Sequence, residues 1–160
     1  MTIAELRKKA GLVIDTNLLL LYLMGIYDPK KISQFKRTQQ FIEEDFRLLV
    51  KFIDLFDKAK VVVTPHILTE TTNLAPNYTF PILQTILESL QENMVESLKI
   101  INSDTTCFNK FGLSDAAIQH LAQQNYLILT DDLPLYHYLA TKGHSVINFN
   151  HIRSGYLLKP

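Results

Sequence analysis

Short runs of aliphatic and β-branched residues alternate along the chain with longer segments whose apolar residues recur every three or four positions. The short runs cover 12–14, 61–63, 127–129 and 146–147, with a weaker fifth at 100–101. Each run is continuously apolar, which is typical of parallel strands covered on both faces. The alternation predicts an α/β fold: a three-layer α/β/α arrangement around a mostly parallel sheet of four to five strands.

The longer segments predict two long amphipathic helices and four shorter ones. The first long helix is expected over 41–58, with one apolar and one polar face: Ile42, Phe46, Leu49, Ile53 and Phe56 against Glu43, Arg47, Lys51, Asp54 and Lys58. The second is expected over 79–98, with Pro81 in its first turn and Leu83, Leu87, Leu90, Met94 and Leu98 on its apolar face. Shorter helices are expected over 17–26, 66–74, 114–124 and 133–142, the last ending at Gly143.

Length and composition favour one globular domain over residues 1–160, with 28–60 as an expanded helical and loop connection. Hydrophobic residues make up 47% and charged residues 20% of the chain, which excludes disordered, collagen-like and coiled-coil classes. The single cysteine, Cys107, excludes an internal disulfide and a cysteine-based zinc site. We interpret it as a small buried residue of a protein in the reducing cytoplasm.

Neither a membrane span nor an export signal is expected. The apolar run 18–27 is far shorter than the ~20 residues that cross a bilayer. Asp15 and Asn17 interrupt the apolar stretch before it, and no small-residue cleavage site follows. We therefore expect a cytoplasmic protein with no membrane partner.

Acidic residues follow two of the predicted strands directly. Asp15 comes after 12–14, and Asp131 and Asp132 come after 127–130. The carboxyl ends of parallel strands are where open α/β sheets bind ligands. A purely local interpretation is also available, because Asp15 and Asp132 stand where N-caps of the following helices would be.

Two further acids lie within helices, on faces that otherwise carry apolar residues. Glu70 shares a face with Ile67 and Leu74, and Asp115 shares one with Ile118. A buried, unpaired carboxylate costs several kcal/mol or is neutralised by a raised pKa. The local alternatives are that Asp115 complements a helix dipole and that Glu70 belongs to a solvent-facing helix side.

If these four segments converge, the repulsion between their carboxylates requires cations. Hard divalent ions with oxygen ligands, Mg²⁺ or Mn²⁺, suit such a site. Soft ligands are scarce, because there is one cysteine and the five histidines have no ligand spacing: His66, His120, His137, His144 and His151. We interpret these histidines as ordinary surface or capping residues. With five glycines, the chain has neither a Walker loop nor a dinucleotide-binding fingerprint.

Four segments, in this order, resemble the PIN-domain nuclease family: VIDTNLLL at 13–20, TPHILTETTNL at 64–74, LSDAAIQHLA at 113–122 and LTDDLPLYHYL at 129–139. The closing HSVINFN at 144–150 resembles the last strand of that family. The nearest style is the bacterial VapC-type toxin branch, from which this chain differs by the expansion at 28–60. A phosphatase of the HAD type also begins with an aspartate after its first strand, but it needs a second aspartate where Asn17 stands.

The resemblance implies a PIN-like Mg²⁺- or Mn²⁺-dependent endoribonuclease whose metals are surrounded by four acids: Asp15, Glu70, Asp115 and Asp132. Asp132 matches the family's T-x-D signature, and Asp131 is the alternative fourth ligand. Asn17 and Thr130 match polar positions that orient the acids. An antitoxin protein and a second copy of the chain are the protein partners that the toxin branch implies.

Phosphodiester hydrolysis agrees with this set of residues, because one or two metals held by carboxylates can activate water and stabilise the leaving oxygen. Without the five acids, 11 acidic residues face 16 basic ones, an excess that suits a phosphate backbone. Lys30, Lys31, Lys36 and Arg37 are the candidate RNA contacts, in a connection that is otherwise interpreted as a mobile surface loop. The alternatives are a housekeeping or defence nuclease acting on RNA or DNA, and a module that binds metal or nucleic acid without cleaving.

Overall fold

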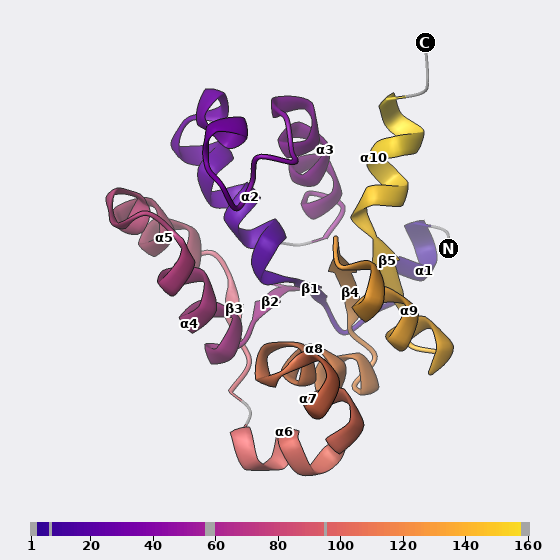
Figure 1. Cartoon of the computed structure of the whole chain (residues 1–160). Coiled ribbons are helices and arrows are strands. Elements are labelled where there is room, and N and C mark those ends of the chain that lie inside the picture. Colours follow the sequence, from indigo (N-terminus) through magenta and orange to yellow (C-terminus); the bar gives the residue numbers. More distant parts are fainter. Residues whose placement is uncertain (1–2, 7, 57–59, 95, 158–160) are drawn as a thin grey trace.

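The computed structural model describes residues 3–6, 8–56, 60–94 and 96–157. An all-parallel sheet of five strands, in the order β3-β2-β1-β4-β5, lies between two layers of helices (Figure 1). The strands are β1 Leu12–Ile14, β2 Val61–Val63, β3 Gln91–Glu92, β4 Leu127–Thr130 and β5 Val146–Asn148. This arrangement confirms the predicted three-layer α/β/α fold.

The described helices are α1 Ile3–Leu6, α2 Thr16–Tyr27, α3 Glu43–Ile53, α4 Pro65–Leu74, α5 Phe80–Leu87, α6 Ser97–Ser103, α7 Thr105–Phe111, α8 Leu113–Gln123, α9 Leu133–Thr141 and α10 Phe149–Leu157. Short 3-10 helices cover η1 Pro29–Gln34 and η3 Asn77–Thr79. In Figure 1, α2 and α3 cover one face of the sheet and α6, α7 and α8 lie on the other.

The centre of the sheet is continuously apolar, as its sequence indicates. Leu12 pairs with Val61 of β2 on one side and with Leu127 of β4 on the other. All residues of these three strands are buried. Strand β1 is thereby enclosed on both faces and both edges, which places Asp15, the residue after it, deep in the molecule.

The prediction of one continuous helix over 79–98 is wrong. Helix α5 ends at Leu87, the edge strand β3 follows, and α6 begins at Ser97. Met94 and Leu98, assigned to the apolar face, are 75% and 74% exposed. The apolar spacing continues across the break by chance, and both residues of β3 are exposed, so no apolar run marks this strand.

The weak strand predicted at 100–101 is also wrong, because these residues lie in α6. Ile100 is buried there in a small separate cluster with Cys107, Ala116 and Ala117. The burial of Cys107 matches its interpretation as a small core residue. A short apolar run does not by itself distinguish a buried strand from the buried face of a helix.

The helix predicted over 41–58 is shorter than expected. Helix α3 begins at Glu43, and Ile42 precedes it as the N-cap residue with 44% of its surface exposed. At the other end, Asp54 caps the helix and the chain turns. Lys58 lies outside the described residues.

Helix α2 occupies the interior, which agrees with the interpretation of 17–26 as core. Its buried side chains include Leu18, Leu21 and Met24. Gly25 allows α3 to approach closely, because a Cβ atom at this position would lie 2.1 Å from the ring of Phe46. The two helices therefore meet across a position where only hydrogen fits.

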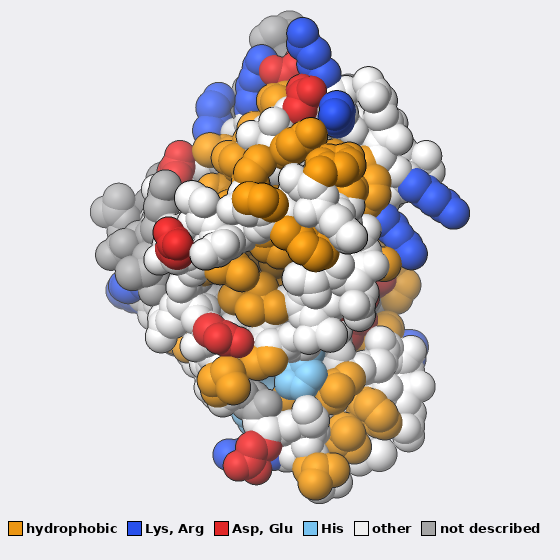
Figure 2. Space-filling model, turned by 90° about the vertical axis from the view of Figure 1, so that its left-hand side faces the viewer, with side chains coloured by type: hydrophobic (Ala, Val, Ile, Leu, Met, Phe, Trp, Pro, Cys, Tyr) orange, Lys and Arg blue, Asp and Glu red, His pale blue; other side chains and the backbone are white. Residues whose placement is uncertain are grey.

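On the side of the molecule facing the viewer in Figure 2, apolar side chains gather over several elements. The exposed large apolar residues include Tyr78 and Phe80. An open groove of about 480 Å³ lies beside α5 and is lined by Thr72, Phe80, Leu83, Gln84, Leu87 and Glu88. No described helix is long and apolar enough to cross a membrane.

We expect Gly25→Ala to lower the free energy of unfolding, measured by denaturant titration. Alanine is favoured over glycine within a helix by about 1 kcal/mol, but overpacking a close contact costs about 1–3 kcal/mol. Gly155→Ala in α10 is the control, because its Cβ would meet nothing within 4 Å. Equal effects of the two substitutions would show that the close contact of Gly25 with Phe46 is unimportant.

Candidate functional site

The candidate site lies where the chain changes direction across the sheet. From β1 the chain proceeds to β2 and β3 on one side, whereas β4 and β5 lie on the other. Open α/β sheets form a ligand-binding crevice at the carboxyl ends of the strands at such a point. The acids after β1 and β4 meet there, since the Asp15 amide donates to Leu129 O at 3.1 Å.

Asp15 is 5% exposed, and each of its carboxylate oxygens accepts a backbone hydrogen bond. Oδ1 accepts from Leu18 N at 2.9 Å and caps α2, while Oδ2 accepts from Asp131 N at 3.0 Å. Burial, and then the charge of Asp131, raise the pKa of Asp15 well above its usual value despite these bonds. The N-cap alternative therefore holds, and the same carboxylate also joins β1 to the end of β4.

Asp131 is buried as well, and both of its carboxylate oxygens are engaged. Asn17 Nδ2 donates to Oδ1 at 3.1 Å, and Gln40 Nε2 donates to Oδ2 at 2.8 Å. Burial raises the pKa of Asp131, and the charge of Asp132 adds to the effect. Asn17 thus orients an acid, although the acid it contacts is Asp131.

Asp132 is exposed at the start of α9. Its Oδ1 accepts from Leu135 N at 2.7 Å, so the N-cap alternative holds for this residue also. Its own amide donates to Thr130 Oγ1 at 3.0 Å. The Thr130 side chain also makes a hydrogen bond that lowers the pKa of Asp15. Thr130 therefore links two of the acids.

Glu70 and Asp115 join this group from the helices beside the sheet. Glu70 is half-buried on α4, and its Oε2 accepts from Thr16 Oγ1 at 2.8 Å. Asp115 lies in the first turn of α8, where burial, then the charge of Asp132 and then that of Glu70 raise its pKa to about 7. The carboxylates on α4 and α8 and the one after the end of β4 are thus close enough for their charges to interact.

No basic side chain forms an ion pair with these five acids among the described residues. The ion pairs that join described residues are Arg47–Glu43, Lys142–Asp104 and Arg153–Asp45. The group therefore offers carboxylate oxygens without a paired cation, and oxygen is the ligand type that Mg²⁺ and Mn²⁺ prefer. Within the part of the chain that the structure describes, no three His, Cys, Asp or Glu side chains are arranged so that they could hold a metal ion.

The sequence did not reveal three residues that hold Asp131. Asn150 Nδ2 donates to Asp131 O at 2.8 Å, and Arg153 Nε donates to Asn150 Oδ1 at 2.8 Å. Arg153 also donates to Gln40 O at 2.9 Å, which closes a ring of contacts through Gln40 back to Asp131. Asn150 could have been suspected, because it follows the last strand as the acids follow β1 and β4; Gln40 and Arg153 stand in no pattern.

The four candidate RNA contacts lie in two neighbouring parts of the connection, a 3-10 helix and the turn that follows it. Lys30 and Lys31 belong to η1 beyond the C-terminal end of α2, a helix about 18 Å long that starts at Asp15. Lys31 Nζ lies 5.0 Å from the centroid of the Tyr27 ring. Lys36 and Arg37 are exposed and precede Gln40, where the chain returns to Asp131.

The connection around these residues is folded, in contrast to the alternative of a mobile surface loop. Residues 29–34 form a 3-10 helix, and Asp28 caps it through the Lys30 amide. Thr38 is fully buried, and its Oγ1 donates to Ile32 O at 2.7 Å.

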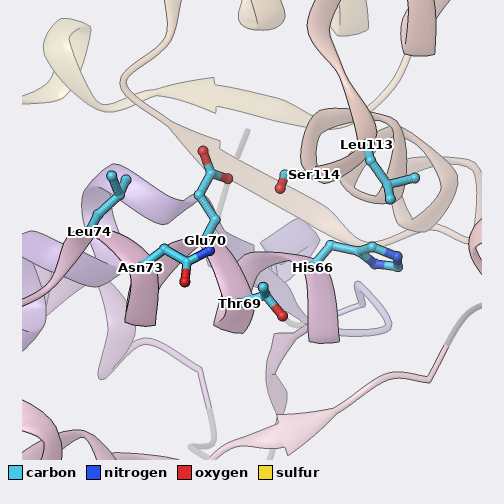
Figure 3. A pocket seen from close by; sticks show the side chains of 7 residues that line it. All are labelled: His66, Thr69, Glu70, Asn73, Leu74, Leu113 and Ser114. Atoms are coloured by element: carbon cyan, nitrogen blue, oxygen red, sulfur yellow. The ribbon is translucent and has the colours of Figure 1, made fainter.

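A pocket of about 410 Å³ opens beside Glu70, between α4 and the start of α8. In Figure 3 the Glu70 side chain rises from α4 on the same side of the pocket as Ser114. His66 lies below Leu113 in this view. His66 is a partly buried residue that lines this pocket.

Comparisons of the chain with models of known protein families, with curated proteins and with solved structures found no match.

We expect Asp115→Asn to raise the free energy of unfolding in chelator-treated buffer at pH 8 by up to about 4 kcal/mol. The folded state holds the Asp115 proton up to a pKa of about 7, whereas an unfolded aspartate releases it near 3.8. Wild-type stability therefore falls as the pH rises through this window, and asparagine removes that loss.

Denaturant titrations between pH 4 and pH 8 measure the difference between variant and wild type, which should grow with pH. Asp54→Asn is the matched control, because Asp54 is exposed at the end of α3. A difference for Asp115→Asn that stays constant with pH would contradict the raised pKa.

Proposed function

We propose that this protein is a metal-dependent endoribonuclease that hydrolyses RNA phosphodiester bonds. The observation that carries the proposal is the convergence of acids from separate segments: Asp15 Oδ2 accepts from Asp131 N at 3.0 Å, and the charges of Asp132 and Glu70 raise the pKa of Asp115. Such a group of carboxylates is costly to the fold unless a ligand uses it. The ordered resemblance to PIN-domain nucleases supports the same conclusion.

Asp15, Glu70, Asp115 and Asp132 are the residues proposed to hold Mg²⁺ or Mn²⁺. Bound metal would supply an activated water and a counter-charge for the leaving oxygen. Asp132 is preferred to Asp131 as the fourth ligand because it is exposed and only its Oδ1 serves as a helix cap. Asp131, whose backbone amide donates to Asp15 Oδ2 at 3.0 Å, is proposed to position Asp15.

Proton transfer in the reaction falls to a carboxylate that contacts the attacking water. A carboxylate of the group that contacts this water and not the metal would accept its proton. No histidine is needed for this step.

A toxin paired with an antitoxin is the biological role we favour, on the resemblance of the four segments to the VapC-type branch. The apolar groove beside α5 supports a protein partner, either an antitoxin or a second copy of the chain, since exposed apolar patches mark interaction sites. A neighbouring antitoxin gene would favour this role over a housekeeping or defence nuclease. The buried lone thiol of Cys107 suits a cytoplasmic enzyme.

We expect the wild type to cut labelled single-stranded RNA with Mg²⁺ or Mn²⁺, and EDTA to abolish the cutting. Asp15→Asn should lower the rate at least about 100-fold, because loss of even an outer-shell partner of a metal ligand costs about 10- to 100-fold. Glu44→Gln is the matched control, an exposed acid at the start of α3. Rates come from gel-resolved cleavage time courses.

A DNA substrate in the same assay distinguishes a ribonuclease from a nuclease that cuts DNA as well. Cutting that persists in Asp15→Asn would place the activity outside this site. Absence of cutting on structured and unstructured RNAs, with metal bound in calorimetry, would favour the non-cleaving module.

We expect Lys36→Ala/Arg37→Ala to weaken RNA binding, measured with the Asp15→Asn variant so that the RNA stays intact. Loss of two phosphate contacts should lower the slope of log affinity against log salt by about 1.4, since each contact to a single strand contributes about 0.7. Lys60→Ala/Lys99→Ala is the control, because Lys60 precedes β2 at the opposite edge of the sheet and Lys99 is exposed on α6. Equal slopes for both double variants would contradict the assignment.

A further inference from the structure

The pocket between α4 and α8 adjoins the carboxylate site at Glu70. Five of its lining residues come from α4, and Leu113 and Ser114 begin α8: His66, Thr69, Glu70, Asn73, Leu74, Leu113 and Ser114. Glu70 lines the pocket and contributes to the raised pKa of Asp115, the residue after Ser114. A phosphodiester held at the acids would therefore have its neighbouring nucleotide beside this pocket.

The charge of the lining excludes an anionic occupant. None of the seven lining residues is Lys or Arg, and Glu70 adds a carboxylate. A phosphate group would be repelled here without any cation to pair with it. The pocket instead suits an uncharged group, and its volume of about 410 Å³ lies within the range of small-molecule sites, about 300–1,000 Å³.

The surfaces of the pocket suit a flat ring with polar edges. Leu74 and Leu113 supply apolar walls. Burial lowers the pKa of His66, which favours its uncharged imidazole ring. Its Nε2 lies 3.0 Å from Ser97 Oγ, and its Nδ1 is buried without a hydrogen-bond partner among the described residues. Neutral aromatic rings and apolar side chains are the surfaces on which unpaired bases stack.

Asn73 supplies recognition at the edge of such a ring. Its side-chain amide offers both donors and an acceptor, and it has no hydrogen-bond partner within the described part of the chain. Asparagine pairs with adenine through two hydrogen bonds, one donated and one accepted.

We propose that this pocket binds the unpaired base of the nucleotide next to the scissile phosphate, with Asn73 reading its edge and favouring adenine. This inference rests on the proposed nuclease function, because it takes the adjoining carboxylates as the place where the phosphate is cut. The pocket then selects where a single-stranded RNA is cleaved.

Binding of the four nucleoside 5′-monophosphates, titrated to millimolar concentration and followed by NMR, tests the pocket without requiring cleavage. Thr69→Trp should fill it, because Thr69 is an exposed position whose Oγ1 donates to Pro65 O within its own helix, and should weaken binding at least about tenfold. Thr72→Trp is the matched control on the same helix, exposed toward the groove beside α5. Asn73→Asp removes the donor and should weaken adenosine monophosphate most.

Absence of nucleotide binding by the wild type, or equal binding by Thr69→Trp and Thr72→Trp, would overturn the pocket. The same preparations are assayed for cleavage of a randomised RNA, with the cut ends sequenced. Cleavage without nucleotide binding contradicts the proposed base-binding pocket but agrees with the proposed nuclease function. Nucleotide binding that Thr69→Trp abolishes, without RNA cleavage, supports the pocket and counts against the nuclease.

Discussion

Burial of the Asp15 carboxylate is the constraint on which the site depends. The continuously apolar β1 delivers this residue into the interior, where a charged group costs several kcal/mol. Backbone amides of Leu18 and Asp131 offset part of that cost, so one side chain begins α2 and fixes the end of β4. The pKa of Asp15 remains raised, which shows that these hydrogen bonds leave the charge undercompensated. A cation would complete the balance.

The rest of the molecule supports this edge of the sheet. Asp131 is held by Asn17 from α2, by Gln40 from the long connection and by Asn150 from α10. Arg153 joins two of these supports and forms an ion pair with Asp45 of α3. Gln40 and the last helix therefore support this edge of the sheet, because without them Asp131, buried beside Asp15, would lose hydrogen-bond partners.

Much of this organisation could be predicted from the sequence, because burial leaves strong patterns. Continuous apolar runs identified β1, β2, β4 and β5, and acids after β1 and β4 indicated the edge of the sheet where buried carboxylates meet. The exposed strand β3 and the break after Leu87 left no such pattern, since their backbone pairing needs no apolar side chains. The roles of Gln40 and Arg153 could not be predicted either, because the hydrogen-bond partner of a polar residue depends on the tertiary fold. Asp15 and Asp132 do cap helices, as the local interpretation predicted. A helix cap can also bind a metal, so this result is compatible with the proposed role of the two residues.

The most direct test of the central claim is anomalous diffraction from crystals soaked in Mn²⁺. We expect an anomalous peak between the carboxylates of Asp15, Glu70, Asp115 and Asp132, within direct bonding distance of their oxygens after small side-chain movements. A peak at another place on the surface, or none at concentrations that saturate other manganese enzymes, would contradict the claim that these acids form one metal-holding unit.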